Sequence, residues 1–83
     1  MKVTVKYFAS IREALGRGSE PVETAATSVA GLRDELTARG GEYAHCLARG
    51  KAVRAALNQV MSDETEPLVA GCEIAFFPPV TGG

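Results

Sequence analysis

The sequence predicts an α+β fold in which a small mixed sheet wraps around one main helix. Apolar and polar residues alternate over residues 2–7, which is typical of a strand with one buried face. Near the end of the chain, residues 73–77 predict another strand, with Ile74 and Phe76 on one face and Ala75 and Phe77 on the other. Between these segments, Val29, Leu32 and Leu36 form a single helical stripe. The stripe and the apolar sheet face must both be covered, so we expect them to pack against each other.

The opening strand is followed by a short helix and a second strand. Ser10 opens the predicted short helix over residues 11–15, and Gly16 closes it together with a second nearby glycine. Residues 20–24 then predict a strand with one large apolar residue. Pro21 makes this strand short or places it at a sheet edge, because proline cannot donate to a ladder.

The main helix has clear start and stop signals. Either Thr27 or Ser28 provides the N-cap, and Gly40-Gly41 provides the stop. Arg33 and Arg39 lie towards the C-terminal end, where we expect the helix dipole to favour their positive charge.

The rest of the chain predicts two further strands. Residues 42–50 are ambiguous, with a possible helical turn over residues 44–47. Alternation over residues 53–57 predicts a third strand, and Asn58 starts a turn. Gly71 marks the turn into the final strand, which gives four strands in all.

Length and composition indicate one globular domain and exclude several functions. The chain has 83 residues, and its 9 basic and 10 acidic residues form no basic run, which disfavours nucleic-acid binding. No apolar stretch reaches the roughly 20 residues that span a bilayer, and the first strand begins at once, so we expect a cytoplasmic protein without a signal peptide. His45, Cys46 and Cys72 have no metal-ligand spacing, so we expect no metal site.

The C-terminal tail is the part of the chain that suggests chemistry. We expect a globular domain over residues 1–77 and an extended tail over residues 78–83. Pro78-Pro79 ends the last strand and starts a stiff stem. Six extended residues reach about 20 Å, and Gly82 and Gly83 carry no side chain, so a narrow channel in a partner can admit them.

The reacting group in this interpretation is the terminal carboxylate of Gly83. A carboxylate is a poor electrophile, whereas its mixed anhydride with AMP can be attacked by a sulfur nucleophile. The product is a thiocarboxylate, which is a tethered sulfur donor. The rest of the sequence offers no paired carboxylates, no nucleophile with a base and no phosphate loop, so partners must supply the catalytic groups.

Two segments resemble the small subunit of molybdopterin synthase, the MoaD family. Residues 76–83 read Phe-Phe-Pro-Pro-Val-Thr-Gly-Gly, like the C-terminal motif of that family, and residues 7–13 resemble its FA-x-x-RE segment. The similarity covers essentially the whole chain. One departure is Gly71-Cys72-Glu73, where the family usually has Gly-Asp-Glu.

The resemblance implies a ubiquitin-like β-grasp fold and a defined set of partners. A ubiquitin-activating-like adenylyltransferase would use ATP to adenylate Gly83, and a sulfurtransferase system would form the thiocarboxylate. The large synthase subunit would then use this sulfur to build the molybdopterin dithiolene from cyclic pyranopterin monophosphate. The family assembles as two large and two small subunits, and the small subunit holds no cofactor permanently.

Strand phase also predicts a docking surface. Phe8 and Phe77 are out of phase with the core residues of their strands, so we expect them on the sheet face away from the helix, with Met61 nearby. Exposed apolar clusters of this kind mark interaction sites. The alternative is that the rings cover a loop. The stem and the tail are expected to contact partners as well, through Pro78, Pro79, Val80 and Thr81.

Three other functions remain open from the sequence. A carrier for another sulfur pathway, such as thiamin thiazole synthesis, would use the same tail, although relatives of that kind tend to lack the short helix at residues 11–15. A ubiquitin-like protein modifier would use the same activation chemistry. A purely structural interaction module would leave the Gly-Gly end unexplained.

Overall fold

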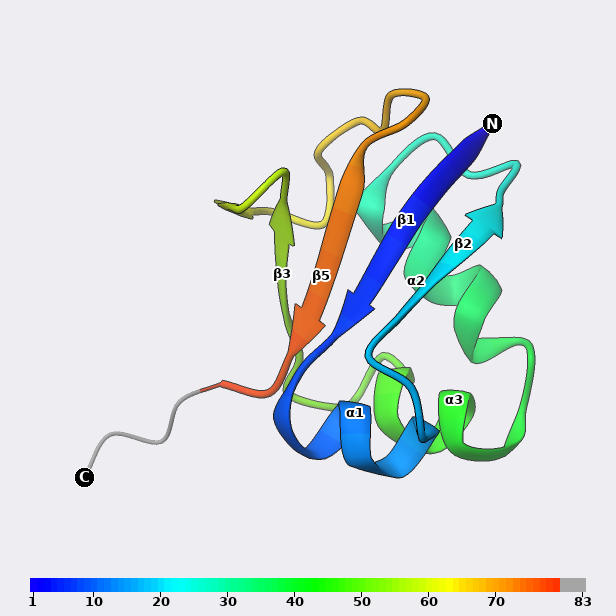
Figure 1. The fold of residues 1–83 in the computed structure, drawn as a ribbon, viewed down its shortest axis with the longest axis vertical. Coiled ribbons are helices and arrows are strands. Elements are labelled where there is room, and N and C mark those ends of the chain that lie inside the picture. Colours follow the sequence, from blue (N-terminus) through cyan, green and yellow to red (C-terminus); the bar gives the residue numbers. More distant parts are fainter. Residues whose placement is uncertain (80–83) are drawn as a thin grey trace.

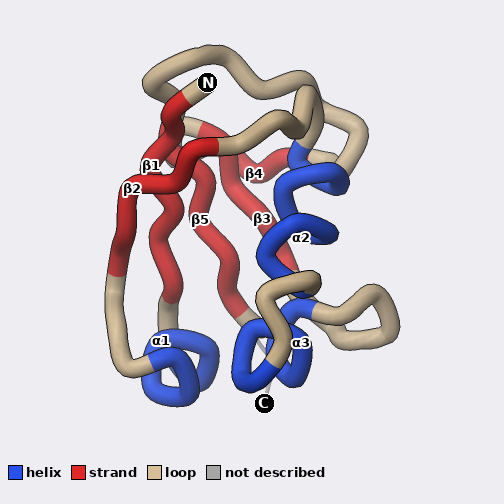
Figure 2. Tube along the Cα trace, turned by 90° about the vertical axis from the view of Figure 1, so that its right-hand side faces the viewer, coloured by secondary structure: helices blue, strands red, loops and turns tan. Residues whose placement is uncertain are grey.

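A mixed sheet forms one layer of the molecule, and one helix crosses its inner face while two shorter helices close one end (Figures 1 and 2). The computed structural model describes residues 1–79. Its elements, in chain order, are β1 (Lys2–Tyr7), α1 (Ala9–Leu15), β2 (Ser19–Glu23), α2 (Val29–Thr37), α3 (Gly41–Leu47), β3 (Arg54–Leu57), β4 (Val60–Ser62) and β5 (Glu73–Phe77).

The last strand lies at the centre of the sheet. The strand order is β2-β1-β5-β3-β4, with β1 and β5 parallel and the other neighbours antiparallel. The predicted α+β arrangement is therefore confirmed. Pro21 lies in β2, which is an edge strand, as predicted, because an edge tolerates the missing N–H.

The core lies between the inner face of the sheet and the apolar stripe of α2. Val29, Leu32 and Leu36 are completely buried, which confirms the predicted stripe. The sheet contributes Val3, Val5, Tyr7, Ile74 and Phe76, which are each at most 1% exposed. Burying an apolar side chain of this size stabilises the fold by about 1.5–3 kcal/mol, so these contacts hold the helix against the sheet.

The start of α2 is capped twice. The Ser28 hydroxyl accepts a hydrogen bond from the Gly31 N–H at 3.1 Å, so one of the two predicted caps is confirmed. The Val29 and Ala30 N–H groups donate to backbone carbonyls of the loop between β4 and β5, at 3.1 and 2.8 Å. These hydrogen bonds supply acceptors for N–H groups that have no partner within the first turn of the helix.

A fifth strand, β4, was missed by the sequence analysis. Asn58 and Gln59 both have positive φ, 49° and 70°, and form a tight turn that folds β4 back onto β3. In β4, Val60 and Met61 are 68% and 57% exposed, so the strand has no alternation of buried and exposed residues. Periodicity therefore gave no signal for it.

Several helix boundaries also differ from prediction. Helix α1 begins at Ala9, one residue before the predicted opening, and Phe8 is its N-cap without a side-chain hydrogen bond. Helix α2 ends at Thr37, and the ambiguous segment forms the complete helix α3. Gly40, with φ of +77°, serves as the N-cap of α3. The glycine pair thus separates two helices, because it allows the chain to reverse direction sharply.

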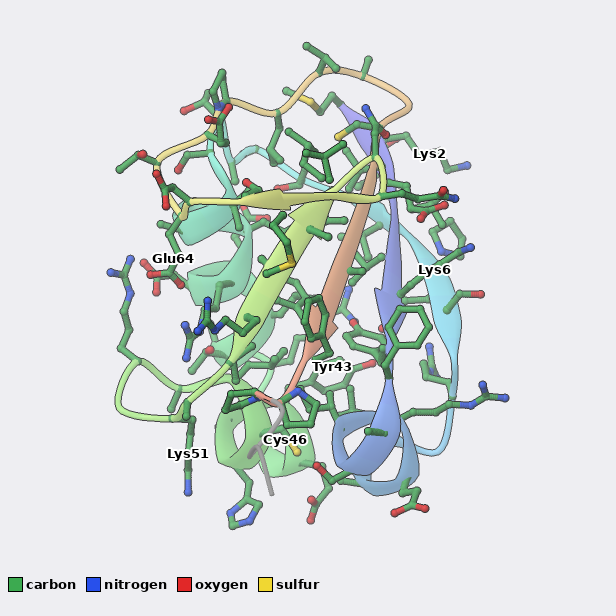
Figure 3. All side chains as sticks on the ribbon, turned by 90° about the vertical axis from the view of Figure 1, so that its left-hand side faces the viewer. Lys2, Lys6, Tyr43, Cys46, Lys51 and Glu64 are labelled. Atoms are coloured by element: carbon green, nitrogen blue, oxygen red, sulfur yellow. The ribbon has the colours of Figure 1, made fainter. Side chains whose placement is uncertain are left out.

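The prediction that Arg33 interacts with the helix dipole was wrong. Its side chain is buried, and its guanidinium donates to the carbonyls of Leu47, Ala48 and Lys51 at 2.6–2.9 Å. It also forms an ion pair with Glu64 at 2.6 Å. Arg33 therefore holds the end of α3 and the loop after β4 against α2, and Glu64 lies beside that helix in Figure 3.

We expect Arg33→Met to lower the free energy of unfolding by about 3 kcal/mol, because it leaves buried carbonyls without a donor. Urea titration followed by circular dichroism measures this loss. Arg49→Met is the matched control, since Arg49 forms an exposed ion pair with Asp34 at 2.8 Å and should leave the midpoint nearly unchanged. Equal losses in the two variants would contradict the anchoring role of Arg33.

A second polar cluster is centred on Glu20 in β2. Glu20 is only 8% exposed, and it accepts hydrogen bonds from the hydroxyls of Tyr7 and Tyr43 at 2.8 and 2.7 Å. Arg17 and Arg39 donate to its other oxygen at 3.1 and 3.0 Å. The cluster ties β1, β2 and α3 together, so one carboxylate joins the sheet to the helical end of the molecule.

The environment of Glu20 changes the acidity of the whole cluster. Burial alone raises the pKa of Glu20, but the hydrogen bonds from Tyr43, Tyr7 and Arg39, with the charge of Arg39, outweigh it and lower the pKa. Burial, followed by the hydrogen bond to Glu20, raises the pKa of both tyrosines. The cluster therefore holds one carboxylate charge and two neutral phenols at neutral pH.

A lowered pKa in the folded state means that Glu20 contributes stability above its unfolded pKa of about 4.3 and loses it as pH falls through the folded value. We expect Glu20→Gln to be clearly less stable than the wild type at pH 7. The gap between the two proteins should narrow below about pH 4. Thermal unfolding from pH 7 down to pH 3 measures the gap, with the exposed Glu13→Gln as control. A stability difference between the wild type and Glu20→Gln that stays constant from pH 7 to pH 3 would contradict the lowered pKa of Glu20 in the folded state.

Candidate docking and transfer site

The predicted tail leaves the molecule from its central strand. The ladder of β5 ends with the Phe8 N–H donating to the Phe76 carbonyl at 3.1 Å and with Phe77 opposite Arg54 on β3. Pro78 and Pro79 follow outside any strand, as predicted. Because β5 pairs with a neighbour on each side, the stem starts from a firmly held point (Figure 1).

The predicted reacting residues lie beyond the described part of the chain. Val80, Thr81, Gly82 and Gly83 are outside residues 1–79. The predictions made for these four residues, and the division at residue 77, therefore stay predictions.

The outer face of the sheet, which points away from α2, has two alanines at its centre and larger side chains around them. The register aligns Lys6, Ala75, Ala56 and Met61 in one row across β1, β5, β3 and β4. Lys2 and Lys6 point away from α2 on this face (Figure 3). The two alanines at the centre are each only 7% exposed, so the exposed part of this face consists of the larger side chains around them. We call this row, with Phe8, Phe77 and Arg54, the outer face patch.

Phe8 and Phe77 lie next to each other at the tail end of this patch. Tyr7 pairs with Phe76 in the parallel register, so the following residues, Phe8 and Phe77, are the next neighbours. Phe8 is 44% exposed, and Phe77 is half-buried. Phe8 therefore does not bury its ring under a loop. Met61 lies on β4, with the strand β3 between it and β5, and its place near the two rings stays a prediction.

A shallow groove of about 370 Å³ lies on the other side of the stem, between α1 and α3. Its lining includes Ile11, His45, Cys46, Lys51 and Pro78. Burial, followed by the charge of Glu42, raises the pKa of the Cys46 thiol. Cys46 is thus a protonated thiol at neutral pH and a weak nucleophile. Figure 3 shows Cys46 and Lys51 at this end of the molecule.

The second cysteine belongs to the core. Cys72, at the position where the family usually has aspartate, is 3% exposed and packs in the apolar cluster. Within residues 1–79, no three His, Cys, Asp or Glu side chains come together as a set of metal ligands. None of the helices among these residues has both the length and the apolar character needed to cross a membrane.

Sequence reasoning missed Arg54 as a part of this site. The sequence did contain a signal for Arg54, because it alternates with the inward-facing residues of its strand and therefore lies on the outer face. Only the strand register shows that Arg54 lies directly opposite Phe77, beside the start of the stem.

Sequence comparison identifies a family and relatives that match nearly the whole chain. The ThiS family profile matches residues 5–83. A molybdopterin synthase sulfur carrier subunit from Escherichia coli (strain K12) is 40% identical over 81 residues, which cover 98% of this chain and 99% of that protein.

Two solved structures share the fold over the full length of both chains. The crystal structure of SAMP1 from Haloferax volcanii has a TM-score of 0.79 and 25% sequence identity. A chain of the complex between subunits 1 and 2 of molybdopterin-converting factor from Helicobacter pylori 26695 has a TM-score of 0.70 and 27% identity. The fold is the predicted ubiquitin-like β-grasp. The chain belongs to the ThiS family, and its predicted relationship to the molybdopterin synthase sulfur carrier subunits is confirmed.

Proposed function

We propose that this chain is the sulfur-carrier subunit of a molybdopterin synthase and that Gly83 carries the sulfur. The observation that carries this proposal is the 40% identity, over 98% of the chain, to a protein with that name. The position of the tail supports it, because Pro78 and Pro79 continue directly from the central strand. The globular part can then rest on a partner while the glycines enter its active site.

Activation of Gly83 takes place in two balanced steps. The terminal carboxylate attacks the α-phosphorus of ATP on an adenylyltransferase, which releases pyrophosphate and forms an acyl-adenylate. A sulfur nucleophile at the sulfide level, delivered by a sulfurtransferase system, then attacks the acyl carbon. AMP leaves, and the thiocarboxylate remains. The chain itself contributes the carboxyl group and a backbone narrow enough to reach both active sites.

Transfer then takes place on the large synthase subunit. This subunit holds cyclic pyranopterin monophosphate and the catalytic groups, and the thiocarboxylate of Gly83 supplies the sulfur. A dithiolene contains two sulfur atoms, so each pterin consumes two charged carriers. An assembly of two large and two small subunits fits this requirement. The Helicobacter pylori complex of subunits 1 and 2 supports pairing with a larger partner.

The outer face patch is the proposed docking surface for both partners. Its rings lie at the strand ends from which the tail departs, so a protein that holds the tail also covers them. The exposed side chains of Phe8 and Met61 offer both partners apolar contact area. Residues Pro78, Pro79, Val80 and Thr81 would line the entrance of the partner's channel.

Incubation with ATP, the adenylyltransferase and a sulfur source should convert Gly83 to its thiocarboxylate. Intact-mass spectrometry should show a gain equal to replacement of one oxygen by sulfur. A chain lacking Gly83 should show no gain. Addition of the large subunit and the pterin precursor should then consume the thiocarboxylate and form the dithiolene, which distinguishes this pathway from thiazole synthesis.

The protein-modifier function remains the second candidate, because the fold matches SAMP1, a small archaeal modifier protein. A modifier would give Gly83-dependent adducts with other proteins that survive denaturing gels. A sulfur carrier would instead give the mass change on the free chain. Absence of the mass change with an active adenylyltransferase would contradict the carrier function.

We expect Phe77→Asp to weaken binding to both the adenylyltransferase and the large subunit by about tenfold or more, because a buried aromatic anchor is replaced by a charge. Surface plasmon resonance with each purified partner measures the affinity. Val69→Asp is the matched control, since Val69 is 60% exposed in the loop before Gly71, at the end of β5 opposite to the tail. Unchanged affinities for Phe77→Asp would remove the patch as a docking surface.

A further inference from the structure

Arg54 is an exposed cation beside the apolar rings of the outer face patch. It is the first residue of β3 and the direct cross-strand partner of Phe77. Within residues 1–79, its guanidinium forms no ion pair and no side-chain hydrogen bond, whereas most other arginines are paired with a carboxylate, as Arg33 is with Glu64. The structure therefore presents an unneutralised guanidinium at the base of the tail.

A partner that covers Phe77 must also remove water from Arg54. Directly opposed residues of an antiparallel pair have Cβ atoms about 4.5–5.5 Å apart, which is less than the reach of an arginine side chain. Burial of an unpaired charge is strongly unfavourable, so binding requires an acceptor for the guanidinium. A carboxylate is the best acceptor, because it can bind both arms of the fork.

The neighbouring charges of the patch do not supply this acceptor. The carboxylate of Glu73 forms an ion pair with Lys6 at 3.3 Å and lies four residues before Phe77, at the start of β5. The tail end of the patch is thus basic as well as apolar, and the acceptor must come from outside the described chain.

We propose that the large synthase subunit places a carboxylate against Arg54 when it accepts the tail. This inference rests on the proposed function and specifies its partner. The complementary surface is apolar where it meets Phe8, Phe77 and Met61, and acidic where it meets β3. Arg54 then sets the orientation of the carrier, because the guanidinium fork fixes one angle of approach around the tail.

The test compares charge changes at Arg54 with the same changes at Arg49, which is exposed and lies in the loop after α3. Binding of the full chain to the purified large subunit is measured at low and high salt for Arg54→Gln, Arg54→Glu, Arg54→Lys, Arg49→Gln and Arg49→Glu. Thermal unfolding confirms that each variant is folded. We expect Arg54→Gln and Arg54→Glu to weaken binding by about tenfold or more, with the larger loss for the reversal.

Two further readouts identify the interaction as a charged contact. Arg54→Lys should recover only part of the affinity, because the ammonium keeps the charge but lacks the two-armed fork, and raising the salt should shrink the difference between the wild type and Arg54→Glu. Both Arg49 variants should stay within about twofold of the wild type. An Arg54→Glu chain that binds as tightly as the wild type, while Phe77→Asp loses affinity, would overturn the inference.

The experiments distinguish a failure of this inference from a failure of the proposed function. A wild-type chain that gains sulfur at Gly83 and binds the large subunit, with Arg54 variants unaffected, would leave the function standing and remove only the carboxylate contact. A wild-type chain that neither gains sulfur nor binds the large subunit would remove the function, and the inference with it.

Discussion

The parallel pairing of β1 with β5 joins the two ends of the chain in the middle of the sheet. Val5 and Ile74 are direct neighbours in this pair, and both are completely buried. Parallel neighbours need a crossover connection, and here nearly the whole chain provides it. This pairing also fixes the point from which Pro78 and Pro79 continue after the last strand.

Two buried charged residues, Arg33 and Glu20, add hydrogen bonds around α3, whose Leu47 is itself part of the apolar core. Arg33 binds carbonyls at the end of α3 and in the following loop, and Glu20 binds tyrosines of β1 and α3. In a domain of this size the core is modest, so hydrogen bonds from fully paired charges give the short helices a defined position. The end of the molecule beside the stem therefore stays in one arrangement.

In the proposed function, the globular body is bound by partners and the tail carries the reacting group. Residues 1–79 offer a sheet face with the rings of Phe8 and Phe77 beside Arg54, and the groove next to it holds a protonated Cys46 with little nucleophilic character. Under the proposed function, partners supply the catalytic groups, and the carrier supplies a docking surface and a bare backbone.

Local pattern was enough to predict much of this protein. The alternation in β1, the apolar run of β5, the stripe of α2, the Ser28 cap and the stem after Phe77 each depend on neighbours in sequence, because they reflect backbone geometry and side-chain periodicity. The sequence by itself therefore determined the fold class, the family and the part of the chain that suggests chemistry.

Tertiary structure decided the rest. The buried roles of Arg33 and Glu20 and the pairing of Arg54 with Phe77 depend on residues distant in sequence. Strand β4 pairs locally with β3, but its residues show no burial pattern that the sequence could reveal. Whether a charge is buried, and what it faces, is settled only when the sheet has closed around the helix.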